Sequence, residues 1–209
     1  QSSFAKFLVM GRDAPQALSW ICAGNVDRPV GAITYTQMLN RRGGIECDLT
    51  VSRLAEDRFY IVTGTGYATH DFDWIRRNIP DGLNAHLIDV TSGHAVLSLM
   101  GPKSRAVLEK LTTDDVSDAG FPFGSMKRIG IAGAPVMALR LTYVGELGWE
   151  LHVPSEFAAG LLGTLLDAEQ APRLCGGMAV KQDIFRKRAG HFRADGGGNS
   201  ITFSLRSAL

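Results

Sequence analysis

Residues 45–54 alternate between apolar and polar side chains, and this alternation limits the folds that the chain can adopt. A period of two is typical of a β-strand with one buried face. The apolar members are Ile45, Cys47, Leu49 and Val51. After Glu56 and Asp57, residues 58–63 form a second run rich in strand-forming side chains, which predicts a hairpin. An antiparallel sheet is therefore expected.

The same kind of pattern recurs along the chain, with helices inserted between hairpins. Further strands are predicted over residues 2–10, 85–90, 95–100, 126–131 and 135–142. Helices are predicted over residues 13–22, 69–79, 101–111 and 155–167. Pro102 suits the first turn of the third helix, and Ser155 suits the N-cap of the fourth. The predicted fold class is α+β, with mainly antiparallel sheets and inserted helices.

The composition is that of a globular protein and gives no sign of a special partner. Hydrophobic residues make up 45% of the 209 residues, and the formal net charge is +1. Neither value favours nucleic acid or a membrane surface. No apolar run reaches the ~20 residues of a membrane span, and no signal peptide opens the chain.

The cysteines and histidines show no metal-ligand spacing, so no metal is predicted. The three cysteines are Cys22, Cys47 and Cys175, and the five histidines are equally scattered. An odd number of separated cysteines indicates a reducing compartment, and a cytoplasmic location is expected.

The character of the sequence changes after residue 170. From Arg173 onward basic residues outnumber acidic ones, and the glycine run at 196–198 interrupts any periodicity. We therefore expect residues 1–170 to form the main domain. Residues 171–209 are expected to be a divergent, basic, Gly-rich tail that is poorly ordered.

Two carboxylates lie on the polar sides of predicted strands. Asp48 falls on the polar side of residues 45–54. Residues 141–154 predict a strand, a tight turn at Gly145 and a second strand, in which Glu150 lies opposite an apolar face. Alternation alone is typical of solvent-facing strand carboxylates, so a functional role needs further support.

Residues 62–66, Val-Thr-Gly-Thr-Gly, imitate the start of a dinucleotide-binding loop. The third glycine of that loop is missing, and the preceding strand belongs to a hairpin rather than to a βαβ unit. Nucleotide binding is therefore not expected. No Ser-His-Asp or Cys-His arrangement is indicated either.

Two motifs resemble the folate-binding aminomethyltransferase family, which includes the T-protein of the glycine cleavage system. The run from Tyr143 to Glu150 is similar to the family's Tyr-Thr-Gly-Glu-x-Gly-x-Glu. The run from Tyr35 through Gly43-Gly44-Ile45 to Asp48 is similar to a second family pattern. The resemblance covers about residues 2–170 and is nearest to the C-terminal folate domain of sarcosine and dimethylglycine dehydrogenases.

The resemblance implies a fold and a site. The fold would be that of the aminomethyltransferase folate-binding domain. Asp48 would be the catalytic acid beside the reacting nitrogens of the folate, and Glu150 would hold the pterin ring. Tyr35 and Tyr143 would lie along the folate. Gly64 stands where glycine-cleavage T-proteins carry an asparagine that contacts folate. The dehydrogenase branch has a glycine at this position, as this chain does.

The chain also departs from the family pattern. Cys47 replaces the first of two consecutive aspartates found in glycine-cleavage T-proteins. The residues that precede the first strand in the family are missing, so the domain is expected to be incomplete at its N-terminus. Residues 181–188 do not match the family's Arg-x-Glu-Lys-Gly-Tyr-Arg, and the folate-binding arginine of that region cannot be assigned.

The resemblance implies one-carbon transfer of the aminomethyltransferase type. Tetrahydrofolate would capture a one-carbon unit from an oxidised methylamine, of the sarcosine or dimethylglycine type, to give 5,10-methylenetetrahydrofolate. The partners would be folate, that one-carbon unit and a flavin dehydrogenase domain, because FAD is expected only from a separate or missing domain. The alternatives are a stand-alone glycine-cleavage aminomethyltransferase and a non-catalytic fragment or binding module that keeps the fold.

Overall fold

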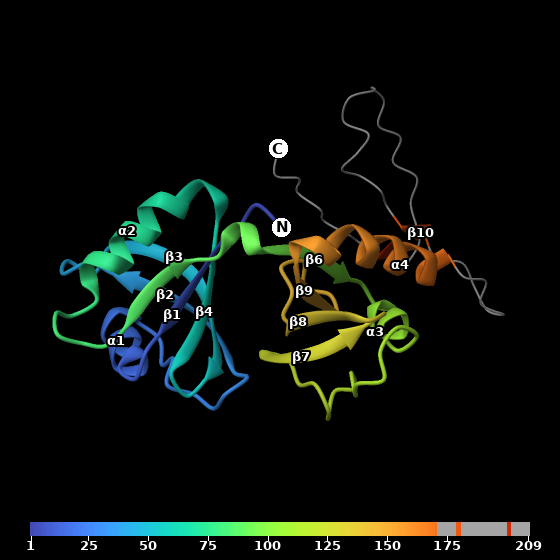
Figure 1. Cartoon of the computed structure of the whole chain (residues 1–209), viewed down its shortest axis with the longest axis horizontal. Helices are drawn as coiled ribbons and strands as arrows, with labels where there is room; N and C mark the ends of the chain where they lie inside the picture. The colour runs from blue at the N-terminus through green and yellow to red at the C-terminus, as the bar shows by residue number, and fades with distance from the viewer. Residues whose placement is uncertain (171–178, 181–199, 202–209) are drawn as a thin grey trace, which may run out of the picture. The chain divides into compact units, whose positions relative to one another are not determined.

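The computed structural model describes residues 1–170, 179–180 and 200–201 (Figure 1). Its contacts group into two compact units within the range that the sequence predicts as one main domain. The five-stranded unit comprises residues 3–93 and 124–126. The four-stranded unit comprises residues 1–2 and 94–123 and the described residues from 127 onward. Apart from the short paired strands β10 (Ala179–Val180) and β11 (Ser200–Ile201), the predicted tail lies outside the described residues.

The five-stranded unit is built on one antiparallel sheet with the strand order β2-β3-β4-β1-β5. The strands are β1 (Ala5–Met10), β2 (Ile33–Leu39), β3 (Ile45–Ala55), β4 (Arg58–Thr63) and β5 (His86–Asp89). The predicted β3–β4 hairpin is confirmed, with Leu49 opposite Thr63. Two helices belong to this unit, α1 (Ala14–Ile21) and α2 (Ala68–Asn78), and a 3-10 turn at Thr65–Tyr67 leads into α2.

One face of this sheet carries the hydrophobic core of the unit. Phe7 and Ile61, which are cross-strand partners in β1 and β4, lie in one cluster with Leu18 of α1 and Ile75 of α2. Both helices therefore cover the same face. Burial of this apolar surface is the main driving force that holds the helices on the sheet.

The alternation predicted for β3 holds from Cys47 to Val51 and fails at both ends, since Ser52, on the predicted polar side, is only 1% exposed. Cys47, Leu49 and Val51 are buried as expected, whereas Ile45 is 66% exposed. The register of the β2–β3 pair shifts between Met38 and Leu39, next to Ile45. A bulge at this point breaks the regular pleat, so Ile45 does not share the core face.

The four-stranded unit also has an antiparallel sheet, with the strand order β6-β9-β8-β7. The strands are β6 (His94–Met100), β7 (Ser125–Ile131), β8 (Ala134–Arg140) and β9 (Gly148–Pro154). Trp149 and Leu151 of β9 lie in the core cluster with Leu108 of α3 and Leu165 of α4. Helices α3 (Ser104–Leu108) and α4 (Ala158–Gln170) thus pack on the same face of this sheet (Figure 1).

The predicted strand–tight turn–strand over residues 141–154 is wrong in its first half. Strand β8 ends at Arg140, and residues 141–147 form an irregular loop before β9. The amide of Leu141 donates to the carbonyl of Leu139 at 3.0 Å, two residues back, instead of extending the ladder to β9. In the run from Tyr143 to Glu150, the first five residues therefore lie in a loop, and Gly148 to Glu150 lie in β9.

Two helix predictions also need correction. The helix predicted over residues 101–111 is confined to Ser104–Leu108, because the amides of Lys110 and Leu111 bond three residues back and tighten the chain into turns. Ser155 is not an N-cap but the first residue of a 3-10 turn, Ser155–Phe157, that precedes α4. Among the described residues, no helix is long and apolar enough to cross a membrane.

The two isoleucines Ile61 and Ile88 test the assignment of the five-stranded core. Ile61 is fully buried, so Ile61→Ala should lower the free energy of unfolding by about 2–5 kcal/mol through lost transfer energy and a cavity. Ile88 is 42% exposed on the edge strand β5, and Ile88→Ala should cost no more than about 1 kcal/mol. Urea unfolding of both variants measures the difference. Equal costs would contradict the assignment.

Candidate functional site

Asp48 lies on the face of the five-stranded sheet opposite the helices, and both of its carboxylate oxygens are held by neighbours on β2. The Tyr35 hydroxyl donates to Oδ2 at 2.7 Å, and the Gln37 amide donates to Oδ1 at 3.0 Å. Gln37 is the cross-strand partner of Asp48, and Tyr35 lies two residues further along the same face. Two hydrogen bonds to one carboxylate fix its rotamer and orientation, while its side chain stays exposed.

The contact with Asp48 changes the acidity of Tyr35. The hydrogen bond to the carboxylate raises the pKa of the Tyr35 phenol, because ionisation would remove the donor and place two negative charges together. The nearby Gln37 amide acts in the opposite direction and lowers the pKa of Tyr35, as the smallest of the contributions. These three side chains form one coupled group, which we call the Asp48 triad.

Gly64 follows β4 and lies close to the same segment of the sheet. The hydroxyl oxygen of the preceding residue, Thr63, lies 3.5 Å from the backbone carbonyl oxygen of Asp48. A Cβ added at Gly64 would lie 3.6 Å from a ring carbon of Tyr67, an ordinary contact, so a side chain at this position is sterically allowed. Packing therefore does not require a glycine at position 64.

Glu150 belongs to the four-stranded unit and is buried, not solvent-facing. It is 6% exposed, and Ser98 of β6 and Leu139 of β8 are its cross-strand partners. His152, two residues on and fully buried, places Nε2 3.5 Å from Glu150 Oε2. The predicted alternation is confirmed, since Trp149 faces the core while Glu150 and His152 share the other face.

Tyr143 lies in the loop over residues 141–147 and is 89% exposed. It belongs to the same unit as Glu150, whereas Asp48, Tyr35 and Gly64 belong to the five-stranded unit. Of the five residues that the resemblance implies, the structure joins Tyr35 and Asp48 by a hydrogen bond. The structure also brings Gln37 to Asp48, a contact that the sequence did not indicate. It depends on the register of the β2–β3 pair, which the sequence alone does not reveal.

The structure also gathers a second polar group, on the helix side of the same sheet. Cys47, His70 and Asp71 place ligand-type atoms within 4.8 Å of one another. His70 Nδ1 lies 2.9 Å from Asp71 Oδ1, and its hydrogen bond to Asp71 raises the pKa of His70. Burial, and next the Asp71 carboxylate, raise the pKa of the Cys47 thiol. The sequence could not reveal this group, because its members come from a strand and a helix far apart in the chain.

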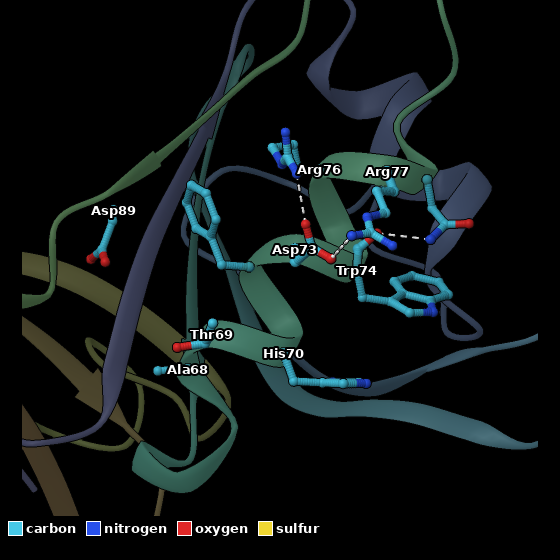
Figure 2. Close-up of a pocket in the computed structure, with 10 residues that line it drawn as sticks. Ala68, Thr69, His70, Asp73, Trp74, Arg76, Arg77 and Asp89 are labelled. Carbon is cyan, nitrogen blue, oxygen red and sulfur yellow. Dashed lines mark hydrogen bonds and ion pairs between the residues drawn. The ribbon is translucent and has the colours of Figure 1, made fainter.

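A surface hollow of about 820 Å³ lies beside α2 (Figure 2). Asp89 of β5 contributes to its lining, as does Asp73, which pairs with Arg76 at 2.7 Å and with Arg77 at 2.8 Å. None of the five residues implied by the resemblance lines this hollow. Its arginines are paired within α2, so the hollow is not the folate site that the sequence predicts.

Comparison with known sequences identifies the family. The sequence model of the GCVT N-terminal domain family matches residues 1–195. The chain belongs to the GCVT N-terminal domain family. The match runs past residue 170, so a boundary at that residue stays a prediction.

The curated relatives of this GCVT N-terminal domain are much longer proteins. Human mitochondrial sarcosine dehydrogenase is 41% identical over 167 residues, which cover 73% of this chain and 18% of that protein. Rat mitochondrial dimethylglycine dehydrogenase is 39% identical over 170 residues, which cover 81% of this chain and 20% of that protein. The chain therefore spans about a fifth of the length of these relatives. The predicted similarity to this branch is confirmed.

A solved structure confirms the predicted fold. The crystal structure of the glycine cleavage system aminomethyltransferase T from Bartonella henselae matches with a TM-score of 0.68 and 28% sequence identity. The match covers 79% of this chain and 44% of that chain. The antiparallel sheets with inserted helices thus follow the aminomethyltransferase fold.

The Asp48 triad predicts opposite changes in the acidity of Tyr35. Asp48→Asn removes the negative charge and should lower the Tyr35 pKa toward its ordinary value. Gln37→Met removes the donor that favours the phenolate and should raise that pKa further. Both shifts can be read from ultraviolet absorbance during pH titration, with Tyr35→Phe subtracted as background. A shift of the same sign in both variants would contradict the triad.

Proposed function

We propose that this GCVT N-terminal domain binds tetrahydrofolate and captures a one-carbon unit from an oxidised methylamine of the sarcosine or dimethylglycine type. The observation that carries the proposal is the Asp48 triad: an exposed strand carboxylate whose two oxygens are fixed by Tyr35 and Gln37. Membership of the family and the names of the relatives support the reaction class.

In this proposal Asp48 is the general base or acid of the reaction. A carboxylate has about four lone-pair sites, and the two bonds from Tyr35 and Gln37 use two of them, so Asp48 can still accept a bond from an amine N–H. Its fixed orientation lets it take or return a proton as general base or acid without rearranging. Holding the reacting groups in place accounts for much of the remaining rate enhancement, since capture becomes effectively unimolecular.

Glu150 recognises the pterin in this proposal. The N3–H and the 2-amino group of a pterin form a donor pair that suits bidentate acceptance by a carboxylate. Glu150 fits this chemistry because it is buried, and its contact with His152 at 3.5 Å leaves lone pairs for a donor pair. When bound, tetrahydrofolate supplies the amine nitrogens that take up the one-carbon unit, giving 5,10-methylenetetrahydrofolate.

Three further residues have smaller roles. Tyr35 and the exposed Tyr143 offer aromatic faces on which ligand rings can stack. Gly64 contributes backbone only, so the polar contact that an asparagine would make is absent.

A flavin dehydrogenase partner completes the proposal. The two curated relatives are named as dehydrogenases, and this chain spans about a fifth of their length. Oxidation of the methylamine is therefore assigned to FAD held by another domain or chain. Both relatives are named mitochondrial, whereas the cytoplasmic location expected from the cysteines stays a prediction.

A glycine-cleavage aminomethyltransferase is the second candidate, and the match to the Bartonella henselae enzyme favours it. Cys47 and Gly64 favour the dehydrogenase branch, because both differ from the residues implied for T-proteins. The donor separates the two candidates: aminomethyl-lipoyl protein for the second, and a formaldehyde-level unit from a methylamine for the first. A chain that binds folate and transfers from neither donor would be a binding module.

Glu150→Gln tests the pterin contact. The amide replaces one acceptor oxygen with a donor, so tetrahydrofolate binding should weaken by ~1–3 kcal/mol, or roughly 5- to 150-fold in Kd. Anaerobic calorimetric titration of the full chain measures the change. Glu146→Gln is the matched control, since Glu146 is exposed in the loop before β9 and should bind as the unchanged chain does. Equal affinities in all three proteins would exclude Glu150 as the anchor.

Asp48→Asn tests proton transfer separately from binding. The amide keeps the shape but cannot take a proton, so binding should be spared while the transfer rate falls by about 10²–10⁴-fold. Single-turnover formation of methylenetetrahydrofolate, corrected for the reaction without protein, gives the rate. Asp57→Asn, in the exposed turn between β3 and β4, is the control. An unchanged rate in Asp48→Asn would remove its catalytic role.

A further inference from the structure

Cys47, His70 and Asp71 combine a thiol, an imidazole and a carboxylate between β3 and the first turn of α2. We propose that these three side chains form a binding site for a zinc-type transition-metal ion. The site is independent of the proposed folate chemistry, because Cys47 faces α2 while Asp48, the next residue, points to the opposite face of the sheet.

The distances suit one metal ion. The ligand atoms of the three side chains lie within 4.8 Å of one another. Tetrahedral zinc with bonds of about 2.0–2.3 Å needs ligand atoms roughly 3.3–3.8 Å apart. The ligand atoms are therefore within about 1.5 Å of the spacing that a tetrahedral zinc ion needs. His70 is half-exposed, so its ring can turn and the ion can enter from solvent.

Each ligand that comes from α2 is supported by a second residue. Thr63 donates to Asp71 Oδ2 at 2.5 Å, which leaves Oδ1 for the metal. Glu46 Oε2 lies 3.5 Å from His70 Nε2, which leaves Nδ1 for the metal, and Asn40 holds the other oxygen of Glu46 at 2.8 Å. A carboxylate on the second ring nitrogen is the usual support of a metal-binding histidine, since it fixes the tautomer and the ring orientation.

The donor set indicates the kind of metal. One thiolate, one imidazole and one carboxylate suit zinc better than magnesium or calcium, which prefer oxygen ligands alone. On binding, the Cys47 thiol loses its proton to solvent, and His70 keeps one proton on Nε2, toward Glu46. Three protein ligands leave the fourth tetrahedral position to water. Because the ligands come from β3 and α2, the ion would fasten the helix to the strand that carries Asp48.

Cobalt titration of the full-length chain tests the site. After treatment with a chelator, one equivalent of Co²⁺ should bind and give a thiolate-to-cobalt absorption band, which Zn²⁺ then displaces. Cys47→Ser should abolish the band. Cys22→Ser and Cys175→Ser, which remove the two other thiols, should keep it. The thermal unfolding midpoint should rise with metal concentration, because the ion binds the folded chain.

Three further variants keep the result clear if Cys47→Ser folds poorly. His70→Gln changes a half-exposed side chain and should abolish tetrahedral cobalt binding, while His86→Gln on exposed β5 should not. Glu46→Gln should weaken metal affinity by about 10–100-fold. The proposal is overturned if the folded chain binds no Co²⁺, or if the thiolate band survives both Cys47→Ser and His70→Gln. In that case the three side chains form only a hydrogen-bonded group.

Discussion

The pleat of β3 is the constraint on which the functional features of the five-stranded unit depend. Cys47 and Asp48 are adjacent, so an extended backbone must send them to opposite faces. Cys47 enters the side covered by α2, and Asp48 reaches the side where Tyr35 and Gln37 of β2 hold it. A slip of one residue in the register would exchange the two faces and destroy both groups at once. The buried apolar residues of β3, such as Leu49, therefore fix the site as well as the core.

The sequence predicted most of this frame because alternation is a local property. Residues 45–63 predicted the hairpin, and the apolar side chains of residues 149–153 predicted the core face of β9. Glu150 and His152 lie on the other face as expected, but they are buried too. The prediction failed where local pattern and register disagree. Ile45 is apolar but lies beside a bulge, and Leu141 folds back on Leu139 before the ladder can continue. Neither departure has a signature in residue type.

The candidate site was predictable only in part, for a related reason. The family motif pointed to Asp48 and Glu150, but the partners that orient them are set by pairing between strands. Gln37 reaches Asp48 because β2 and β3 align in one particular register, and His152 reaches Glu150 because both lie on one face of β9. The Cys47, His70 and Asp71 group requires the packing of α2 on the sheet. Tertiary contacts of this kind are not encoded in spacing along the chain.

In the proposed function, Asp48 acts from one fixed orientation, because Tyr35 and Gln37 each hold one of its carboxylate oxygens. The two donors, Tyr35 and Gln37, come from the neighbouring strand and not from a mobile loop, so they are in place before any ligand binds. A preorganised group of this kind costs little reorganisation when charge moves during the reaction. In the proposed function, the exposed side of Asp48 is open to an amine, whereas the buried Glu150 binds the pterin. The two carboxylates differ in environment, one exposed and one buried, and the proposal gives them the separate tasks of catalysis and binding.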